Sequence, residues 1–298
     1  MVKHMHCKIK FLNMRNSTIG AFPWNYKNII KAVKPEWPRL LEFATKTNLI
    51  LDLKKSDLKP KDMETIAYLL ANNPYGASKV TNLSLSQNAV KGDGAKYLSP
   101  ALKVNTTLTY LNLSSCRLGV SGMVHICDAL KTNKSLQSLS LYRNIFDVDG
   151  ARALGTALKT NTSLRFLDIG HNRIRLTGLK SIVEGIKANP ASQVTDLSIK
   201  WNFINDEGFT YLFDQMVFPV QGRVQQLKNL WIKNNFLSEY HKVDLNKRLA
   251  EANLTGTIYV DEFECVNLLS KEFIDRSVWI APMPKAMLGQ ESQVSKFF

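Results

Sequence analysis

Apolar and polar positions alternate in short stretches that recur along most of the chain. Five stretches are clearest: LTYLNLSSCRL from 108, LQSLSLYRNIF from 136, LRFLDIGHNRI from 164, VTDLSIKWNFI from 194 and LKNLWIKNNFL from 227. Related copies start at 48, 80 and 255, so successive starts are 28 to 33 residues apart. In each copy the apolar fourth and sixth positions alternate with polar residues, which predicts a short strand with one buried face.

A helix is predicted after each of the central strands. Apolar residues recur there at i, i+3 and i+7, on one helical face. The sets are Ala95, Leu98 and Leu102; Met123, Ile126 and Leu130; Ala151, Leu154 and Leu158; Leu179, Ile182 and Ile186; and Phe209, Leu212 and Met216. We expect the helix N-caps at residues that precede a glycine: Asp93, Ser121, Asp149, Thr177 and Glu207. A Lys-x-Asn triplet near the end of the first four helices predicts a left-handed asparagine cap.

The ninth position of the repeat is mostly asparagine, as at 88, 144, 172, 202 and 235, with Cys116 and Ser56 as substitutes. An amide side chain there can satisfy backbone groups that a turn leaves unpaired. The pattern L-x-x-L-x-L-x-x-N-x-L at about 28 residues resembles the leucine-rich repeat of the ribonuclease-inhibitor-like class. The resemblance covers roughly residues 48–265.

This resemblance implies an α/β fold: a leucine-rich-repeat solenoid, or horseshoe, with parallel strands on the concave face and helices on the convex face. Helices are about 10 Å wide and strands lie about 4.8 Å apart, so stacked units must curve in this sense. About seven to eight repeats fill residues 48–265. Residues 1–47 are expected to form an N-terminal cap and residues 266–298 a C-terminal cap or tail, because terminal repeats expose apolar surface.

The repeat register directs the third, fifth and seventh positions into the concavity and places the eighth at its rim. These positions are mostly small or polar in the early repeats and become aromatic or charged later. The predicted partner-binding residues are Tyr142, Arg143, Phe166, His171, Lys200, Trp201, Trp231, Lys233 and Tyr259. Aromatic residues and arginine dominate interface hot spots, which favours a protein partner on the concave face. Two alternatives stay open: the C-terminal tail covers these aromatics, or they have no role.

Charge adds a second candidate surface. The chain has 39 basic and 25 acidic residues, a formal charge of +14, and no acidic residue before Glu36. We expect a basic patch of Lys3, Lys8, Lys10 and Arg15 that could attract RNA, tubulin tails or anionic lipid. Apolar residues alternate with basic ones here, which is typical of a strand rather than of a helical targeting peptide.

Chemistry-bearing motifs are missing from the sequence. It contains no phosphate-binding loop, dinucleotide fingerprint, zinc-protease motif or nucleophile elbow. The five histidines lack ligand spacing, and the four cysteines form no CxxC pair. We therefore expect no enzyme activity, no metal and no cofactor. No apolar run is long enough to cross a bilayer, and the cysteine pattern indicates a reducing intracellular compartment.

These observations favour a non-catalytic scaffold or adaptor, a subunit of a large cytoskeletal, ciliary or organellar assembly that binds protein through its concave face. A cytoplasmic or cytoskeletal location is favoured, and a mitochondrial one stays open. One alternative is an RNA-associated protein of a ribosomal or ribonucleoprotein assembly, although concave charges of both signs argue against it. Another is a Ran-type GTPase-activating protein, whose long acidic C-terminal tract this chain lacks.

Overall fold

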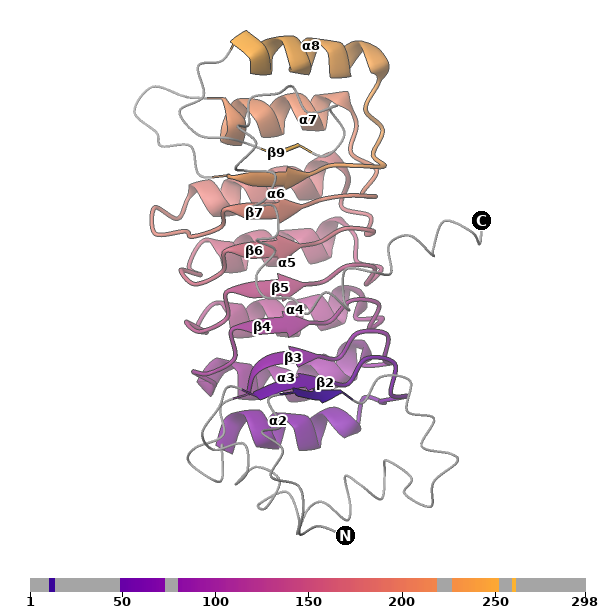
Figure 1. Cartoon of the computed structure of the whole chain (residues 1–298), viewed down its shortest axis with the longest axis vertical. Helices are drawn as coiled ribbons and strands as arrows, with labels where there is room; N and C mark the ends of the chain where they lie inside the picture. The colour runs from indigo at the N-terminus through magenta and orange to yellow at the C-terminus, as the bar shows by residue number, and fades with distance from the viewer. Residues whose placement is uncertain (1–10, 14–48, 73–79, 219–226, 252–258, 261–298) are drawn as a thin grey trace.

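The computed structural model describes residues 11–13, 49–72, 80–218, 227–251 and 259–260. Nine strands in these ranges form one parallel sheet in chain order (Figure 1). They are β1 (Phe11–Asn13), β2 (Leu49–Asp52), β3 (Val80–Ser84), β4 (Tyr110–Asn112), β5 (Ser138–Ser140), β6 (Phe166–Asp168), β7 (Asp196–Ser198), β8 (Asn229–Trp231) and β9 (Tyr259–Val260). The expected strands of the central repeats are confirmed.

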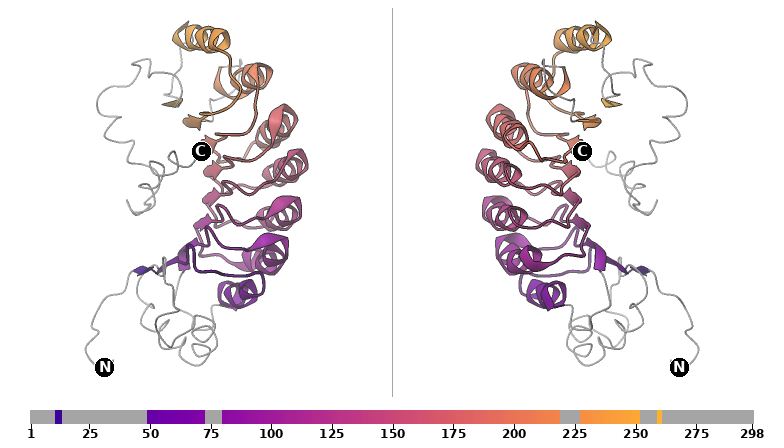
Figure 2. Two further views of the ribbon diagram at one scale, coloured as in Figure 1. Left: turned by 90° about the vertical axis from the view of Figure 1, so that its right-hand side faces the viewer. Right: turned by 90° about the vertical axis from the view of Figure 1, so that its left-hand side faces the viewer.

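From β2 to β9, helices connect successive strands and lie on one side of the sheet (Figure 2). They are α2 (Asp62–Asn72), α3 (Lys91–Val104), α4 (Gly119–Leu130), α5 (Val148–Leu158), α6 (Arg175–Lys187), α7 (Asp206–Leu212) with the π-helical turn η1 (Phe213–Val217), and α8 (Glu239–Glu251). The wider helices occupy the outside of the arc and the strands its inside. The predicted α/β solenoid is confirmed.

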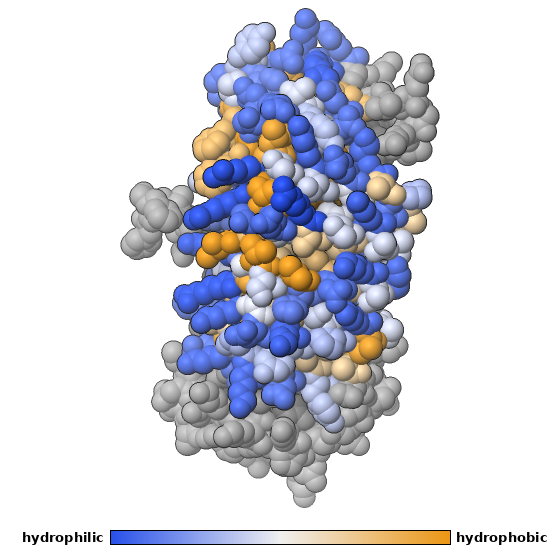
Figure 3. Space-filling model, turned by 180° about the vertical axis from the view of Figure 1, so that it is seen from behind, coloured by the Kyte–Doolittle hydropathy of each residue, from blue (hydrophilic) through white to orange (hydrophobic). Residues whose placement is uncertain are grey.

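One continuous apolar core lies between strands and helices. Its strand side consists of the fourth and sixth repeat positions, such as Leu139 and Leu141, which are completely buried. Its helix side is the predicted apolar face, and all fifteen residues of that face are buried. Each leucine removed from water in this way stabilises the fold by about 1.5–3 kcal/mol. The outward surface of the helices is mainly hydrophilic (Figure 3).

Asparagine at the ninth position joins each repeat to the one before it. Asn144 is completely buried, and its Oδ1 accepts hydrogen bonds from the backbone N–H groups of Cys116 (3.1 Å) and Leu118 (3.2 Å). Its Nδ2 donates to the carbonyl of Leu113 at 2.8 Å. Asn172 accepts in the same way from the N–H of Asn144 at 2.9 Å. The expected role of these amides is confirmed.

A second asparagine series follows the helices, and here one expectation is wrong. Asn105, Asn133, Asn161 and Asn189 are absent from the residues with positive φ, so they form no left-handed caps. Instead each Nδ2 donates to the carbonyl of a leucine near the end of the helix in the previous repeat. For Asn133, which follows α4, this leucine is Leu102 of α3, at 2.7 Å. The Oδ1 of Asn133 accepts from the N–H of Leu136 at 2.8 Å. These amides therefore fix the chain where it enters the next strand.

The helix starts also differ from the expectation. The N-caps of α3 to α7 lie two or three residues earlier than predicted, and the side chains that cap α5 and α7 are Asp147 and Asn205. The glycine one turn into the helix has a packing role. A Cβ on Gly150, for example, would lie 2.7 Å from the Cβ of Phe146. The glycine lets the first helical turn approach the buried residue that ends the strand loop.

The two ends of the sheet extend the repeat array. β1 pairs in parallel with β2, although the basic alternating residues 1–10 lie outside the described part of the chain. β9 pairs with β8, which confirms the decayed last repeat as a strand. The segments expected to form the caps fall almost entirely outside the described residues, so both caps stay predictions.

The asparagine bonds predict a position-dependent stability effect. Asn144→Ala leaves two buried N–H groups and a carbonyl without their partner, and we expect it to lower the free energy of unfolding by about 1–3 kcal/mol. Asn235→Ala removes equivalent bonds at a half-buried site that water can reach, so its effect should be smaller. Urea unfolding of both variants makes the comparison. Equal losses would contradict burial as the cause.

Candidate functional site

The concave face is built from the third and fifth positions of each repeat, which lie in its strand. The paired registers align these positions across the sheet, so Tyr110, Ser138, Phe166 and Asp196 form one row. Asn112, Ser140, Asp168, Ser198 and Trp231 form the next. Small residues separate the large ones, which leaves room for aromatic rings to lean over neighbouring strands.

Two of the predicted residues meet across an intervening strand. Phe166 of β6 and Trp231 of β8 have ring centroids 5.8 Å apart in an edge-to-face arrangement. Between them, β7 presents Ser198 opposite Trp231. Because serine is small, the indole can reach over it to the phenyl ring. Such aromatic pairs add about 0.5–1.5 kcal/mol beyond burial, so this pair gives the C-terminal half of the concave face a rigid apolar feature.

Three other predicted residues form a chain of rings along the edge of the concave face. His171 lies 5.6 Å from Tyr142 and 5.9 Å from Trp201 between ring centroids. His171 and Trp201 occupy the eighth position, where the backbone is left-handed, with φ values of 54° and 55°. Trp201 remains 49% exposed. An exposed indole on a backbone that favours glycine or asparagine has no evident role in folding.

Asp168 lies at the centre of the concave face in a network of hydroxyl groups. Ser140 donates to its Oδ2 at 3.0 Å, and the N–H of Gly170 donates to its Oδ1 at 3.0 Å. The Oγ of Ser114, in the turn after β4, lies 2.8 Å from the Oγ of Ser140 and extends the network to the neighbouring repeat. Burial raises the pKa of Asp168, and hydrogen bonds from Gly170 and Ser198 oppose the increase. The network therefore links four successive repeats and holds a carboxylate at a site that disfavours its charge.

The remaining predicted residues divide into two groups. Arg143 and Lys233 are exposed and Lys200 is half-buried, so cationic groups surround the aromatic ones. Tyr259 lies in β9, but its side chain is outside what the structure describes. The basic patch of Lys3, Lys8, Lys10 and Arg15 lies outside the described residues as well.

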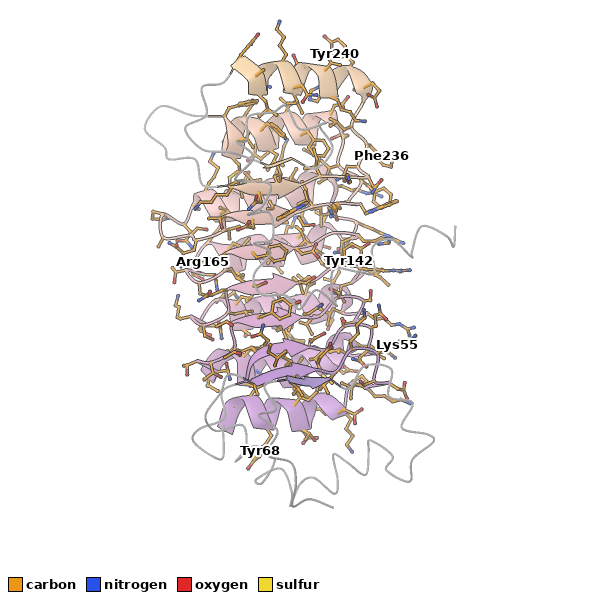
Figure 4. The ribbon with its side chains drawn as sticks, viewed as in Figure 1. Lys55, Tyr68, Tyr142, Arg165, Phe236 and Tyr240 are labelled. Carbon is orange, nitrogen blue, oxygen red and sulfur yellow. The ribbon has the colours of Figure 1, made fainter. Side chains whose placement is uncertain are left out.

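Sequence reasoning missed a further set of exposed apolar residues at the loop edge. Ile145, Phe203 and Phe236 occupy the tenth position, one residue after the ninth-position asparagine, and are 47–63% exposed. Phe203 and Phe236 have ring centroids 5.4 Å apart, and Tyr240, at the start of α8, is 83% exposed. Figure 4 shows Phe236 and Lys55 on one edge of the solenoid and Arg165 on the other. The repeat pattern contained the information needed to predict this exposure, because the tenth position lies between two buried ones and must point outward.

The described residues offer little for catalysis. Burial raises the pKa values of Cys116 and Cys127 to about 12, so neither thiol supplies a thiolate near neutral pH. No group of three or more histidine, cysteine or acidic residues in the described ranges could hold a metal ion. Among the helices that the structure describes, none is long and apolar enough to span a membrane.

Comparison with known proteins gives one family match. Residues 104–127 and 160–183 match the family model described as Leucine Rich repeat. No curated protein sequence matches the chain. Among solved structures it is similar to "Leiomodin-1 Actin-Binding Site 2", with 20% identity, 44% of this chain and 76% of that chain covered, and a TM-score of 0.37. It is also similar to a chain of the yeast Rad7 and Elc1 complex, with 11% identity, coverage of 74% and 80%, and a TM-score of 0.24. At these scores neither likeness bears on function.

The environment of Asp168 predicts that removing the charge of its carboxylate raises the free energy of unfolding, by an amount that depends on pH. Its folded-state pKa is raised, so the ionised form costs stability once the pH exceeds the unfolded value of about 3.9. Asp168→Asn mimics the protonated acid, and we expect it to be more stable than the wild type at pH 7–8. The difference should shrink below about pH 4, where the wild type is protonated in both states.

The measurement is the difference in free energy of unfolding between variant and wild type across pH. Asp149→Asn is the matched control, because its exposed carboxylate pairs with Arg152 at 2.9 Å and gains nothing from neutralisation at pH 7. A loss of stability in Asp168→Asn at neutral pH would show that the hydroxyl network outweighs the burial of charge.

Proposed function

Because this chain is a leucine-rich-repeat protein, we propose that it is a non-catalytic scaffold that binds a protein partner on its concave face. Repeats of this kind are generally interaction scaffolds rather than enzymes, and the buried, protonated cysteines agree with that role. The helix in each repeat and the spacing near 28 residues favour the ribonuclease-inhibitor-like class. A subunit of a large intracellular assembly, cytoskeletal, ciliary or organellar, is the form of this function that we expect.

The observation that carries the proposal is the cluster of aromatic rings on the concave side of repeats four to seven. Tyr142, His171 and Trp201 form one ring chain, and Phe166 and Trp231 form a second pair. The rings are held by contacts with one another, so little side-chain entropy remains to be lost when a partner binds. Rigid aromatic anchors with cationic neighbours such as Lys233 have the composition of interface hot spots.

The charges on the concave face support a protein partner over a nucleic acid. Asp168 and Asp196 lie in the middle of the same face, and the N–H of Gly170 and the hydroxyl of Thr195 donate to them. Carboxylates at the centre of the face would repel a phosphate backbone, whereas a protein surface can offer groups of either sign.

The test begins with affinity capture by the tagged full-length chain from its source, with and without nuclease, and continues with dissociation constants for the recovered partner. Trp231→Ala should weaken binding by about 2 kcal/mol, or roughly thirtyfold. Trp201→Asn should weaken it similarly and leave the melting temperature unchanged or higher, because asparagine tolerates the left-handed backbone at this position.

Tyr97→Ala is the matched control, since Tyr97 is an exposed aromatic residue on convex helix α3. It should bind like the wild type. A partner bound equally by all variants would remove the concave site, and binding that nuclease abolishes would favour the RNA-associated alternative.

A further inference from the structure

The loop edge at the carboxyl ends of the strands carries left-handed backbone that recurs with the repeat and that most of the side chains there do not favour. All thirteen non-glycine residues with positive φ in the described part of the chain lie on this edge. Left-handed backbone costs an ordinary residue about 1–2 kcal/mol, and a β-branched residue such as Ile145, at φ 61°, is a clear outlier. Glycine or asparagine would relieve this cost, so the side chains that stand there call for another explanation.

The first five repeats make this edge basic. The eighth, tenth and twelfth positions of these repeats carry seven cationic and two acidic residues. One acidic residue, Asp57, lies 3.9 Å from Lys59, and the other, Asp147, caps α5. The other cations are exposed and form no ion pair within the described residues: Lys55, Lys91, Arg117, Arg143, Arg173 and Arg175. A row of like charges without internal partners is complementary to an acidic ligand.

The last repeats make the same edge apolar. Trp201, Phe203, Phe236 and Tyr240 are 47–83% exposed, which is unusual for side chains of this size on one edge. We call this apolar end and the six cations the basic–aromatic rim. It follows the outer edge of the solenoid on which Figure 4 shows Lys55 and Phe236.

We propose that the basic–aromatic rim binds an acidic protein segment that carries an apolar anchor at one end. The rim from the first to the seventh repeat spans six strand spacings of about 4.8 Å, or about 29 Å. An extended chain covers that length with about nine residues at roughly 3.3 Å each. Acidic side chains would pair with the arginines, and an aromatic or aliphatic side chain would pack on Phe203 and Phe236.

Protein fits this surface better than nucleic acid. Ile145 is 59% exposed within the basic stretch and provides no planar face on which a base could stack. Phe203 and Phe236 pack on each other, with ring planes 49° apart, so they form a small apolar surface rather than separate stacking platforms. The rim shares Trp201 and Arg143 with the edge of the concave site, whereas Phe166 and Trp231 lie at strand positions of the concave face and are not part of the rim.

The test uses the full-length chain and a fluorescein-labelled peptide of eight glutamates with a Leu-Phe-Leu anchor, at either end. Fluorescence anisotropy gives the dissociation constants. Arg173→Glu with Arg175→Glu should weaken binding at least tenfold. The control pair Lys96→Glu with Lys159→Glu makes the same change in net charge on the convex side and should weaken binding far less.

The apolar end is tested by Phe203→Asn with Phe236→Ser, which should weaken binding of the anchored peptide at least fivefold and leave a peptide of glutamates alone unaffected. Val124→Ser, on exposed convex α4, is its control. Phe203 has a φ of 58°, so Phe203→Asn suits the left-handed backbone and misfolding is not expected to cause the loss.

Three results would overturn the proposal. Equal weakening by both charge-reversal pairs would mean that the peptide responds to net charge only. Tighter binding of polyuridine RNA than of the peptide, lost in the same rim variants, would identify the rim as a nucleic-acid surface. Loss of peptide binding in Trp231→Ala, with the rim variants unaffected, would place the peptide on the concave face and leave the scaffold proposal standing without the rim.

Discussion

The hydrogen bonds of the ninth-position asparagine are the constraint on which the rest of this structure depends. A chain that leaves a strand, turns and enters a helix inside an apolar core must bury N–H and C=O groups that neither element can pair. Asn144 and Asn172 each pair such groups in two successive repeats. Because one amide serves two repeats, every unit is locked in register with its neighbour. These buried bonds add to the strand pairing and the apolar core, and they give the solenoid a defined geometry.

That geometry determines how the functional side chains are presented. For the asparagine to reach the preceding repeat, the residue before it takes a left-handed conformation, as at Arg143, His171 and Trp201. A left-handed residue at the end of a strand directs its side chain away from the sheet and toward the rim. The position is strained in every repeat, yet only Asn234 among the seven is asparagine and none is glycine. The identity of the side chain there is therefore decided by something other than backbone preference.

The repeat register made most of the fold predictable. The strands and the buried helix faces follow from periods of two and 3.6 residues, which depend only on local geometry. Helix starts were predicted too late, because Asp149 and its neighbouring glycine resemble a cap, whereas the glycine is required by contact with Phe146. The second asparagine series was misread for a similar reason. Asn133 has the composition of a left-handed cap, but its bonds go to another repeat, and no local pattern encodes that contact.

The candidate site was predictable to the extent that it depends on register. The sequence placed Phe166 and Trp231 on one face, but their contact depends on the small Ser198 between them and on the pairing of three strands. The loop edge was not predicted, because the repeat pattern identifies only the faces of strands and helices. Phe203 and Phe236 follow buried asparagines, and a residue between two buried positions must point outward.

The concave face and the basic–aromatic rim differ in how many contacts their side chains form within the chain itself. On the concave face, rings contact rings, and the hydroxyl of Ser140 bonds to Asp168, so part of the favourable energy is already realised in the isolated molecule. On the rim, Arg173 and Arg175 have no ion pair within the described residues, and Phe203 combines strain with exposure. Side chains that cost stability and form few internal contacts gain most from a partner. Contacts already formed on the concave face make its rings rigid, which favours selectivity. The unpaired charges on the rim provide long-range attraction and so favour rapid association.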